Sequence, residues 1–431
     1  MTAGVQNFRL DGIYQQRQEG FLMQRVKLPA GVISSLQARV VCEAAERFGK
    51  GSIHLTTRGS MELHWLRESD LPAVRRLLTS AGLTSRGACG GAVRGITCGS
   101  GHGSLHFPLI EDLARRLQRH FAGNPRFERL PKKFKIGIEA DVSGKRHLIQ
   151  DVGLVLNPGG EGQLCYDMYV AGGLGREPRA GFLLAAALTE ERIIPMIEAV
   201  VRVYAAGTPA GKRLKHLLAA IGEQEFRRRV AEDLAAAEEL PPRLGLSENI
   251  LAPVAAPREW AEAFFFAGQL SSDDLRNVAN LADEYSDGVM LVTAEQNIAL
   301  PVAQPGDPGQ ARQALAQAGF IPDRHVTLRV CPGSHECRMG LAPTRDIARS
   351  ILAAMGPAGE GLTWGISGCN NSCSQPQLAD VGIVIARLAA EEDGQRTPRF
   401  DLYRSVPTGL GEKVAASLNL TELLEQIASV C

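Results

Sequence analysis

The stretch Gly31-Val-Ile-Ser-Ser35 decides the fold, because it recurs 237 residues later as Gly268-Gln-Leu-Ser-Ser272. The match continues without a gap, so that Ala45, Phe48, Gly51, Ile53, Leu55, Thr56 and Leu63 fall on Ala282, Tyr285, Gly288, Met290, Val292, Thr293 and Leu300. Chance similarity between two ordinary α+β patterns is the alternative, and the gapless run speaks against it.

Each copy predicts the same order of elements. After the serines, apolar residues recur at spacings of three and four as far as Phe48 or Tyr285, which predicts an amphipathic helix capped by serine. The next stretch alternates apolar and polar residues, which predicts a strand pair or one bent strand, at 52–64 and 289–300. A second helix is predicted at Leu71–Ala81 and Gly309–Ala318. The sequence therefore predicts two α+β half-domains.

A second, looser repeat follows each half-domain. Asp151-Val-Gly-Leu-Val-Leu156 resembles Asp380-Val-Gly-Ile-Val-Ile385, which gives the order A-B-A′-B′ with pseudo-twofold relation. The segment around Pro241 and Pro257 is polar and proline-rich, as linkers are. We expect the first half-domain at 1–86, its partner domain at 87–237, the linker at 238–258, the second half-domain at 259–325 and its partner domain at 326–431.

Composition narrows the class of protein. The 431 residues are enough for two to four domains, and the hydrophobic (45%) and charged (22%) fractions are those of folded globular chains. Lys plus Arg and Asp plus Glu are both 47, so binding nucleic acid through bulk charge is not expected. No apolar stretch approaches the ~20 residues of a membrane span, and Met1–Glu19 lacks the apolar core of a signal peptide. We expect a cytoplasmic protein with reduced thiols.

Differences between the copies point to function. Arg58 falls on Glu295, a reversal of charge that favours anion binding by the first copy alone. Lys133 and Lys135 precede the Asp151 strand on a segment expected to be extended, which would put both ammonium groups on one side. Their approximate counterparts are Leu362 and Trp364. The first half is thus expected to bind an anion.

The cysteines of the second half carry the strongest chemical signal. Cys331 and Cys337 have five residues between them, and Cys369 and Cys373 have three. Four thiolates are the ligand set of a [4Fe–4S] cluster. Structural zinc, which prefers pairs two to four residues apart, and unligated thiols are the alternatives. The other cysteines, including Cys89 and Cys98 around a glycine-rich loop, are expected to be ordinary core or surface residues.

Together these residues resemble the sirohaem-dependent sulfite and nitrite reductases, most closely the ferredoxin-type sulfite reductases. The resemblance covers the chain from about Gly20 to Asp380 and beyond. It implies duplicated ferredoxin-like half-domains, each followed by an α/β domain that binds sirohaem and a [4Fe–4S] cluster. It further implies Cys331, Cys337, Cys369 and Cys373 as cluster ligands, with Cys373 shared with the sirohaem iron, and Thr57 and Asn371 as cofactor contacts. Arg58, Arg94, Lys133 and Lys135 match the substrate-binding cations.

The resemblance implies reduction of sulfite to sulfide, with electrons from an external donor such as ferredoxin or a flavoprotein. Lys133-Phe-Lys135 matches sulfite reductases, whereas plant-type nitrite reductases tend to have Asn at the second lysine. Nitrite reduction, tetrapyrrole oxidation like that of precorrin-3B synthase, and a non-catalytic iron–sulfur electron carrier are the alternatives. The charged region 212–234 and the run Gly172-Gly-Leu-Gly175 carry weaker signals. We expect a solvated face for the first, with binding of cofactor carboxylates or of an acidic ferredoxin by its Lys and Arg residues as the alternative. For the second, we do not decide between structure and cofactor contact.

Overall fold

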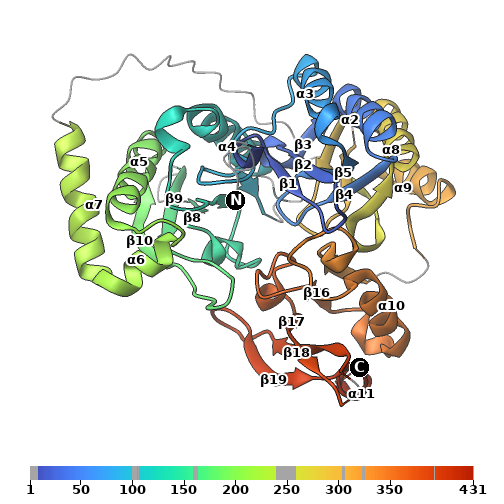
Figure 1. The fold of residues 1–431 in the computed structure, drawn as a ribbon. Helices are drawn as coiled ribbons and strands as arrows, with labels where there is room; N and C mark the ends of the chain where they lie inside the picture. Colours follow the sequence, from blue (N-terminus) through green and yellow to red (C-terminus); the bar gives the residue numbers. More distant parts are fainter. Residues whose placement is uncertain are drawn as a thin grey trace. The chain divides into compact units, whose positions relative to one another are not determined.

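The computed structural model describes residues 8–99, 104, 106–158, 164–238, 259–302, 306–322, 326–392 and 394–430. The chain divides into two compact units, shown as a ribbon in Figure 1. Unit 1 comprises Met1–Asp11, Arg86–Gly173 and Arg179–Arg258, and unit 2 comprises Gly12–Ser85, Leu174–Pro178 and Glu259–Cys431. The two repeated half-domains lie in unit 2, which also carries all four cysteines of the predicted cluster site.

The first half-domain consists of β1 (Ile13–Gln15), β2 (Leu22–Val26), β3 (Val32–Ser34), α2 (Ser35–Phe48), β4 (Ser52–Leu55), β5 (Met61–Leu66) and α3 (Leu71–Ser80). The second consists of β11 (Trp260–Ala263), β12 (Gln269–Ser271), α8 (Ser272–Tyr285), β13 (Val289–Val292), β14 (Ile298–Pro301) and α9 (Pro308–Gln317). The predicted helices and strand pairs are confirmed to within a residue or two. Strands β1, β2, β3, β11 and β12 were not predicted.

The repeated serines begin the two equivalent helices. Ser34 Oγ accepts from the backbone N–H of Gln37 at 3.1 Å, and Gln37 Oε1 accepts from the Ser34 N–H at 3.1 Å. Ser271 and Asp274 form the same reciprocal pair in the second copy. Two of the N–H groups that would lack partners at each helix start are thereby satisfied, as the serine cap predicted.

The two copies exchange a strand. The sheet orders are β1-β2-β5-β4-β12 and β11-β14-β13-β3, so β12 of the second copy completes the first sheet and β3 of the first copy completes the second. All of these pairings are antiparallel, with Leu270 opposite Ile53 and Met290 opposite Ile33. Helices α2 and α8, each entered from an exchanged strand, pack side by side (Figure 1).

The looser repeat forms two sheets of one topology. In unit 1 the order is β10-β9-β8-β7-β6 and in unit 2 it is β15-β16-β17-β18-β19. In both, the first three strands in sequence are parallel and the last two antiparallel. The unit 1 elements are β6 (Thr97–Cys98), α4 (Phe107–Phe121), β7 (Ile136–Glu139), β8 (Val152–Pro158), β9 (Leu164–Val170), β10 (Phe182–Leu188), α5 (Glu190–Gly207), α6 (Leu214–Ile221) and α7 (Glu223–Glu238). The unit 2 elements are β15 (Thr327–Val330), α10 (Thr344–Ala354), β16 (Thr363–Ser367), β17 (Val381–Ala390), β18 (Arg396–Arg404), β19 (Glu412–Leu418) and α11 (Leu420–Val430). The A-B-A′-B′ prediction is confirmed.

The repeated aspartate fixes the strand beside it. Asp151 Oδ2 accepts from the backbone N–H of Lys135 at 2.9 Å, and Asp380 Oδ2 accepts from that of Thr363 at 2.8 Å. Lys135 is therefore equivalent to Thr363. The expected alignment of Lys135 with Trp364 is wrong by one residue, because the connection from β16 to Asp380 is one residue longer than the connection from β7 to Asp151.

The repeated glycine is required by a close backbone crossing. A Cβ on Gly153 would lie 2.3 Å from the carbonyl oxygen of His147, and a Cβ on Gly382 would lie 2.1 Å from that of Pro376. Both separations are far below van der Waals contact. The Asp-Val-Gly pattern therefore marks a loop that passes directly over the strand in each copy.

A buried core supports the cysteine loops of unit 2. Trp364, Ile366, Ile383 and Phe400 are fully buried between the β15–β19 sheet and helices α10 and α11. The predicted linker 238–258 lies outside the described residues except for Glu238, which ends α7. Within the described part of the chain, no helix is both long and apolar enough for a membrane span. The predicted domain borders remain a prediction.

Candidate active site

The four cysteines lie in two loops at one edge of the β15–β19 sheet. Cys331 directly follows β15, and Cys369 comes two residues after β16 ends. Because β15 and β16 are parallel neighbours, both loops leave the sheet at the same edge. The backbone N–H of Gly368 donates to Cys331 Sγ at 3.0 Å, which joins the two loops directly.

Electrostatics also group the four thiols. Burial, together with the neighbouring Cys373 and Cys369, raises the pKa of Cys337 to about 11. Burial and then Cys373 raise the pKa of Cys331 above its usual range, against the N–H groups that donate to its sulfur. The other thiols act on Cys331 and Cys337 because they lie close by, and bound iron would relieve the repulsion by taking the sulfurs as thiolates.

The donor set fits a [4Fe–4S] cluster. A cubane spreads its four thiolates more widely than one metal ion does, and among the described residues no three His, Cys, Asp or Glu side chains could hold a single ion. Cys373 is exposed whereas the other three cysteines are half-buried, so its sulfur is the one open to a further ligand.

A tight turn brings Thr57 and Arg58 to the cysteine loop. The turn closes through a hydrogen bond of 2.9 Å from Thr56 N–H to the Ser60 carbonyl, and Thr56 Oγ1 accepts from the Arg58 N–H at 3.3 Å. Thr57 Oγ1 donates to the carbonyl oxygen of Cys373 at 2.8 Å. Arg58 is half-buried, and its position is fixed by a turn that is itself bonded to the Cys373 peptide.

The remaining predicted contact of unit 2 is Asn371, which is exposed two residues before Cys373. Its neighbour Ser372 has a φ of +53°, so the loop turns sharply between the two. Gln375, two residues after Cys373, donates from Nε2 to the Thr57 carbonyl at 3.2 Å. The loop is therefore tied to the turn at both Cys373 and Gln375.

In unit 1, two adjacent segments carry the other predicted cations. Val93 bridges Phe134 in parallel, and the Arg94 N–H donates to the Phe134 carbonyl at 2.8 Å. Phe134 is completely buried, whereas Lys133 and Lys135 are half-buried. The burial alternates along this segment as it does on an extended strand, and the predicted placement of both ammonium groups on one side stays a prediction.

Arg94 is more deeply buried than the sequence suggested. It is 8% exposed, and its guanidinium donates to the Gly90 carbonyl at 3.0 Å and the Gly87 carbonyl at 3.4 Å. These bonds use two of the five N–H donors of a guanidinium. Arg94 thus shapes its own loop, and its predicted contact with substrate remains a proposal.

A group of cations in unit 1 is buried; sequence reasoning missed Arg146 and gave cofactor binding by Arg213 and Lys215 only as the alternative to a solvated face. Arg146, Arg213 and Lys215 are 5–6% exposed. Arg213 NH2 donates to Asp151 Oδ2 at 2.8 Å and to the Gly172 carbonyl at 3.4 Å. The expected solvated face for region 212–234 is therefore wrong for Arg213 and Lys215, although Arg227–Arg229 are half-buried or exposed. The basic run Lys212-Arg213-Leu-Lys215 was the signal in the sequence.

The charge balance of this group fits an anionic cofactor. Among the described residues of unit 1 the buried cations are Arg94, Arg146, Arg213 and Lys215, and the buried carboxylates are Glu139 and Asp151. Buried charges are normally compensated. The carboxylates of a sirohaem are groups that buried cations of this kind would bind.

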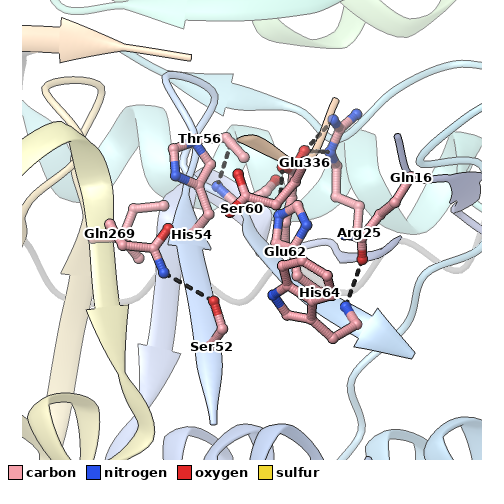
Figure 2. A network of polar contacts seen from close by, with 12 residues as sticks. Gln16, Arg25, Ser52, His54, Thr56, Ser60, Glu62, His64, Gln269 and Glu336 are labelled. Carbon is pink, nitrogen blue, oxygen red and sulfur yellow. Dashed lines mark hydrogen bonds and ion pairs between the residues drawn. The ribbon is translucent and has the colours of Figure 1, made fainter. Parts of the chain in front are cut away.

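A buried polar network lies beside the cysteine loop in unit 2 (Figure 2). Arg25 bonds to Glu62 at 3.0 Å through Nε, and His64 Nε2 lies 3.5 Å from the same carboxylate. Burial alone would raise the pKa of Glu62, but Arg25 and His64 hold it below its usual range. The Glu62 charge also contributes to the raised pKa of Cys337. An ionised carboxylate therefore remains buried near one predicted cluster ligand, and sequence reasoning missed it.

Comparisons with known proteins agree with this arrangement. The profile of the nitrite and sulphite reductase 4Fe-4S domain matches residues 89–237, and that of the nitrite/sulfite reductase ferredoxin-like half domain matches residues 14–81 and 260–318. A ferredoxin–nitrite reductase of Synechococcus elongatus is 30% identical, covering 95% of this chain and 86% of the relative. A ferredoxin sulfite reductase of Mycolicibacterium paratuberculosis is 26% identical, covering 94% of this chain and 80% of the relative.

A solved structure gives the same fold. The Mycobacterium tuberculosis NirA protein superposes with a TM-score of 0.82 at 22% identity, covering 98% of this chain and 85% of that one. Reductases of this kind use sirohaem and a [4Fe–4S] cluster, and the thiols and buried cations described above fit both groups. The duplicated half-domains, the matched profiles and the 30% identical relative show that this chain belongs to the nitrite and sulfite reductase family.

Proposed function

We propose that the protein reduces sulfite to sulfide in a six-electron reaction, with electrons from an external donor. The observation that supports the choice of sulfite is the pair Lys133 and Lys135, two half-buried lysines on either side of buried Phe134, which bridges Val93. Two ammonium groups suit an oxyanion that carries up to two negative charges and takes up protons as its oxygens leave as water.

The proposed roles in unit 2 follow from the turn and the cysteine loops. Cys331, Cys337, Cys369 and Cys373 would hold the cluster, and exposed Cys373 would be the cluster ligand nearest the sirohaem. Thr57 steadies the Cys373 peptide through its 2.8 Å hydrogen bond, and Asn371 contacts the macrocycle from the exposed side of the same loop. Arg58 offers a planar fork of N–H donors to the oxygens of the anion.

The proposed roles in unit 1 depend on charge. Lys133 and Lys135 attract the anion and donate protons to oxygen atoms as the S–O bonds break. Arg94 adds a fixed positive charge, with its loop carbonyls holding the guanidinium in place. When bound, sirohaem supplies the Lewis-acidic iron for the anion and the cluster supplies electrons one at a time.

Nitrite reduction to ammonia by the same residues is the second candidate. It is favoured by a specific observation: the 30% identical Synechococcus relative and the Haloferax mediterranei relative, 27% identical, are both ferredoxin-dependent nitrite reductases. Nitrite carries one negative charge, so the second lysine contributes less to its binding. The names of the relatives also support ferredoxin as the external donor.

The test is anaerobic turnover of sulfite and of nitrite by the holoenzyme with a reduced viologen dye. We expect Arg58→Ala to lose about 10- to 100-fold in sulfite kcat/KM, the effect of one charge-assisted contact, while the cofactor absorption bands persist. Lys135→Asn should lower sulfite turnover more than nitrite turnover. Lys132→Asn is the matched control, because Lys132 is an exposed lysine of the same segment. Unchanged sulfite turnover in both the Arg58 and Lys135 variants would contradict the assignment, and a faster parent reaction with nitrite than with sulfite would favour the second candidate.

A further inference from the structure

The turn that carries Arg58 has a twin in the second half-domain with a different chemical content. Thr293 N–H donates to the Asn297 carbonyl at 2.9 Å, the same distance as in the 56–60 turn. The residue before the end of the turn is Gly59 in the first copy, with a φ of +57°, and Gln296 in the second, with a φ of +66°. The backbone conformation is the same in the two copies, but the second copy has a glutamine side chain where the first has glycine.

Gln296 holds an unfavourable backbone conformation. The left-handed region is open to glycine but strained for a residue with a side chain, so a glutamine there is retained when its side chain is needed. The amide is also tightly enclosed: Gln296 is 1% exposed, and a Cβ on Gly268 would lie 2.7 Å from its Nε2. Both features point to a defined role for the amide.

The Gln296 amide bonds to two separate backbone segments. Its Oε1 accepts from the Val330 N–H at 2.7 Å, and its Nε2 donates to the Val330 carbonyl at 3.0 Å. The same Nε2 donates to the Leu55 carbonyl at 2.7 Å. The amide therefore satisfies both polar groups of one residue in β15 and the last carbonyl of β4.

These two segments lead directly to the predicted site. Val330 precedes Cys331, a predicted cluster ligand, and Leu55 precedes the turn that holds Thr57 and Arg58. Thr57 already ties that turn to Cys373. Gln296 joins the strand residue before the same turn, Leu55, to the peptide between Val330 and Cys331.

We propose that Gln296 is a positioning residue for the reaction: its amide holds the Cys331 peptide in register with the Arg58 turn. The inference rests on the proposed function only in taking Cys331 as a cluster ligand and Arg58 as an anion-binding residue. In this division of labour, the first copy supplies the anion-binding arginine, and the second copy uses the same turn to fix the geometry around it.

The test compares two variants of the holoenzyme that relieve the same kind of backbone strain. Gln296→Gly restores the residue of the first copy and removes the amide. Asp287→Gly is the matched control, because exposed Asp287 has a φ of +52° in the same half-domain and does not touch the site. We expect iron release to a chelator to become about tenfold faster in the first variant and to be unchanged in the second, since losing buried hydrogen bonds favours local opening.

Two further readouts separate positioning from general destabilisation. The electron paramagnetic resonance signal of the reduced cluster should change in Gln296→Gly, and KM for the anion should rise more than kcat falls. Gln296→Glu provides a second variant, since it keeps the size and the acceptor for the Val330 N–H but cannot donate to the two carbonyls. It should show the same changes.

Parent-like iron release and a parent-like resonance signal in both Gln296 variants would overturn the inference. Failure of both variants to fold, with Asp287→Gly folded, would also overturn it, because the amide would then serve folding rather than the site. Failure of the proposed function is distinct: it would appear as absent sulfite and nitrite turnover in the parent protein, whatever the iron-release rates of the variants.

Discussion

His54 should make the stability of the protein depend on pH in a way that one substitution removes. The side chain is 3% exposed inside unit 2, next to Gln296 and close to Glu62 (Figure 2). Burial lowers its pKa from 6.5 to about 3, although the Glu62 charge opposes the shift. His54 is therefore neutral in the folded protein at any pH near neutrality.

The sign and size of the effect follow from proton linkage. Below pH 6.5 the unfolded chain binds a proton that the folded protein does not, so the stabilising contribution is complete above pH 6.5 and is lost as the pH falls toward 3. At pH 5 the loss is about 2 kcal/mol, from one and a half pH units at ~1.4 kcal/mol each. The loss of stability at pH 5 depends only on the pKa of His54 in the unfolded chain, because its pKa in the folded protein lies well below 5.

The assay is urea unfolding at pH 7.5 and pH 5.0 for the parent and for His54→Gln. Glutamine cannot take up the proton, so the parent should lose about 2 kcal/mol more than the variant between the two pH values. Taking the difference between the two proteins cancels the other titrating groups that they share. Equal losses in the two proteins would refute the reasoning, because they would mean that His54 is protonated to the same extent folded and unfolded.

Two other substitutions test the architecture and the site. Gly382→Ala places a methyl group about 2 Å from the Pro376 carbonyl and should lower the unfolding free energy by roughly 1–3 kcal/mol or abolish folding. Gly361→Ala is the control, because its methyl group meets nothing within 4 Å, and it should change the unfolding free energy little. Equal thermal midpoints of the two variants would show that the backbone crossing at Gly382 can relax. Thr57→Val keeps the shape of the side chain but removes the donor to the Cys373 carbonyl, so it should lower the free energy of unfolding by about 1–3 kcal/mol in a urea titration. Thr57→Ser keeps the donor and should stay close to the parent. A serine variant as unstable as the valine variant would assign the loss to packing.

Much of the architecture could be predicted because the same sequence pattern occurs in two copies. The capping serines, the helix periodicity and the Asp-Val-Gly strands recur with matching local chemistry, and local chemistry is what a sequence displays. Strand partners are not local: the repeat includes the residues of β3 and β12, but nothing in it says that they form strands or that each joins the other copy's sheet. Pairing is decided by which edges remain open once the helices pack, and this requires the whole molecule.

The candidate site also has a part that could be predicted from local sequence and a part that could not. The cysteine loops could be predicted because ligand spacing is a property of the sequence, and the structure groups the four thiols at one sheet edge. Arg213 and Lys215 were expected to be solvated because basic residues on a helix usually are, and only packing against the Gly172 and Gly173 carbonyls buries them. Gln296 gave no signal, because its importance lies in bonds to residues far away along the chain.

The exchanged strands impose an order on biosynthesis. Strand β4 presents an open edge from the time it is made until β12, more than two hundred residues later, emerges to cover it. Until then the nascent first copy can neither close its sheet nor bury the surface of α2 that faces α8. Contacts of such long range form slowly and leave partly folded chains prone to misassembly. Ribosome pausing or chaperone shortage between those two points should therefore reduce the yield of folded protein more than the same disturbance after β12 has emerged.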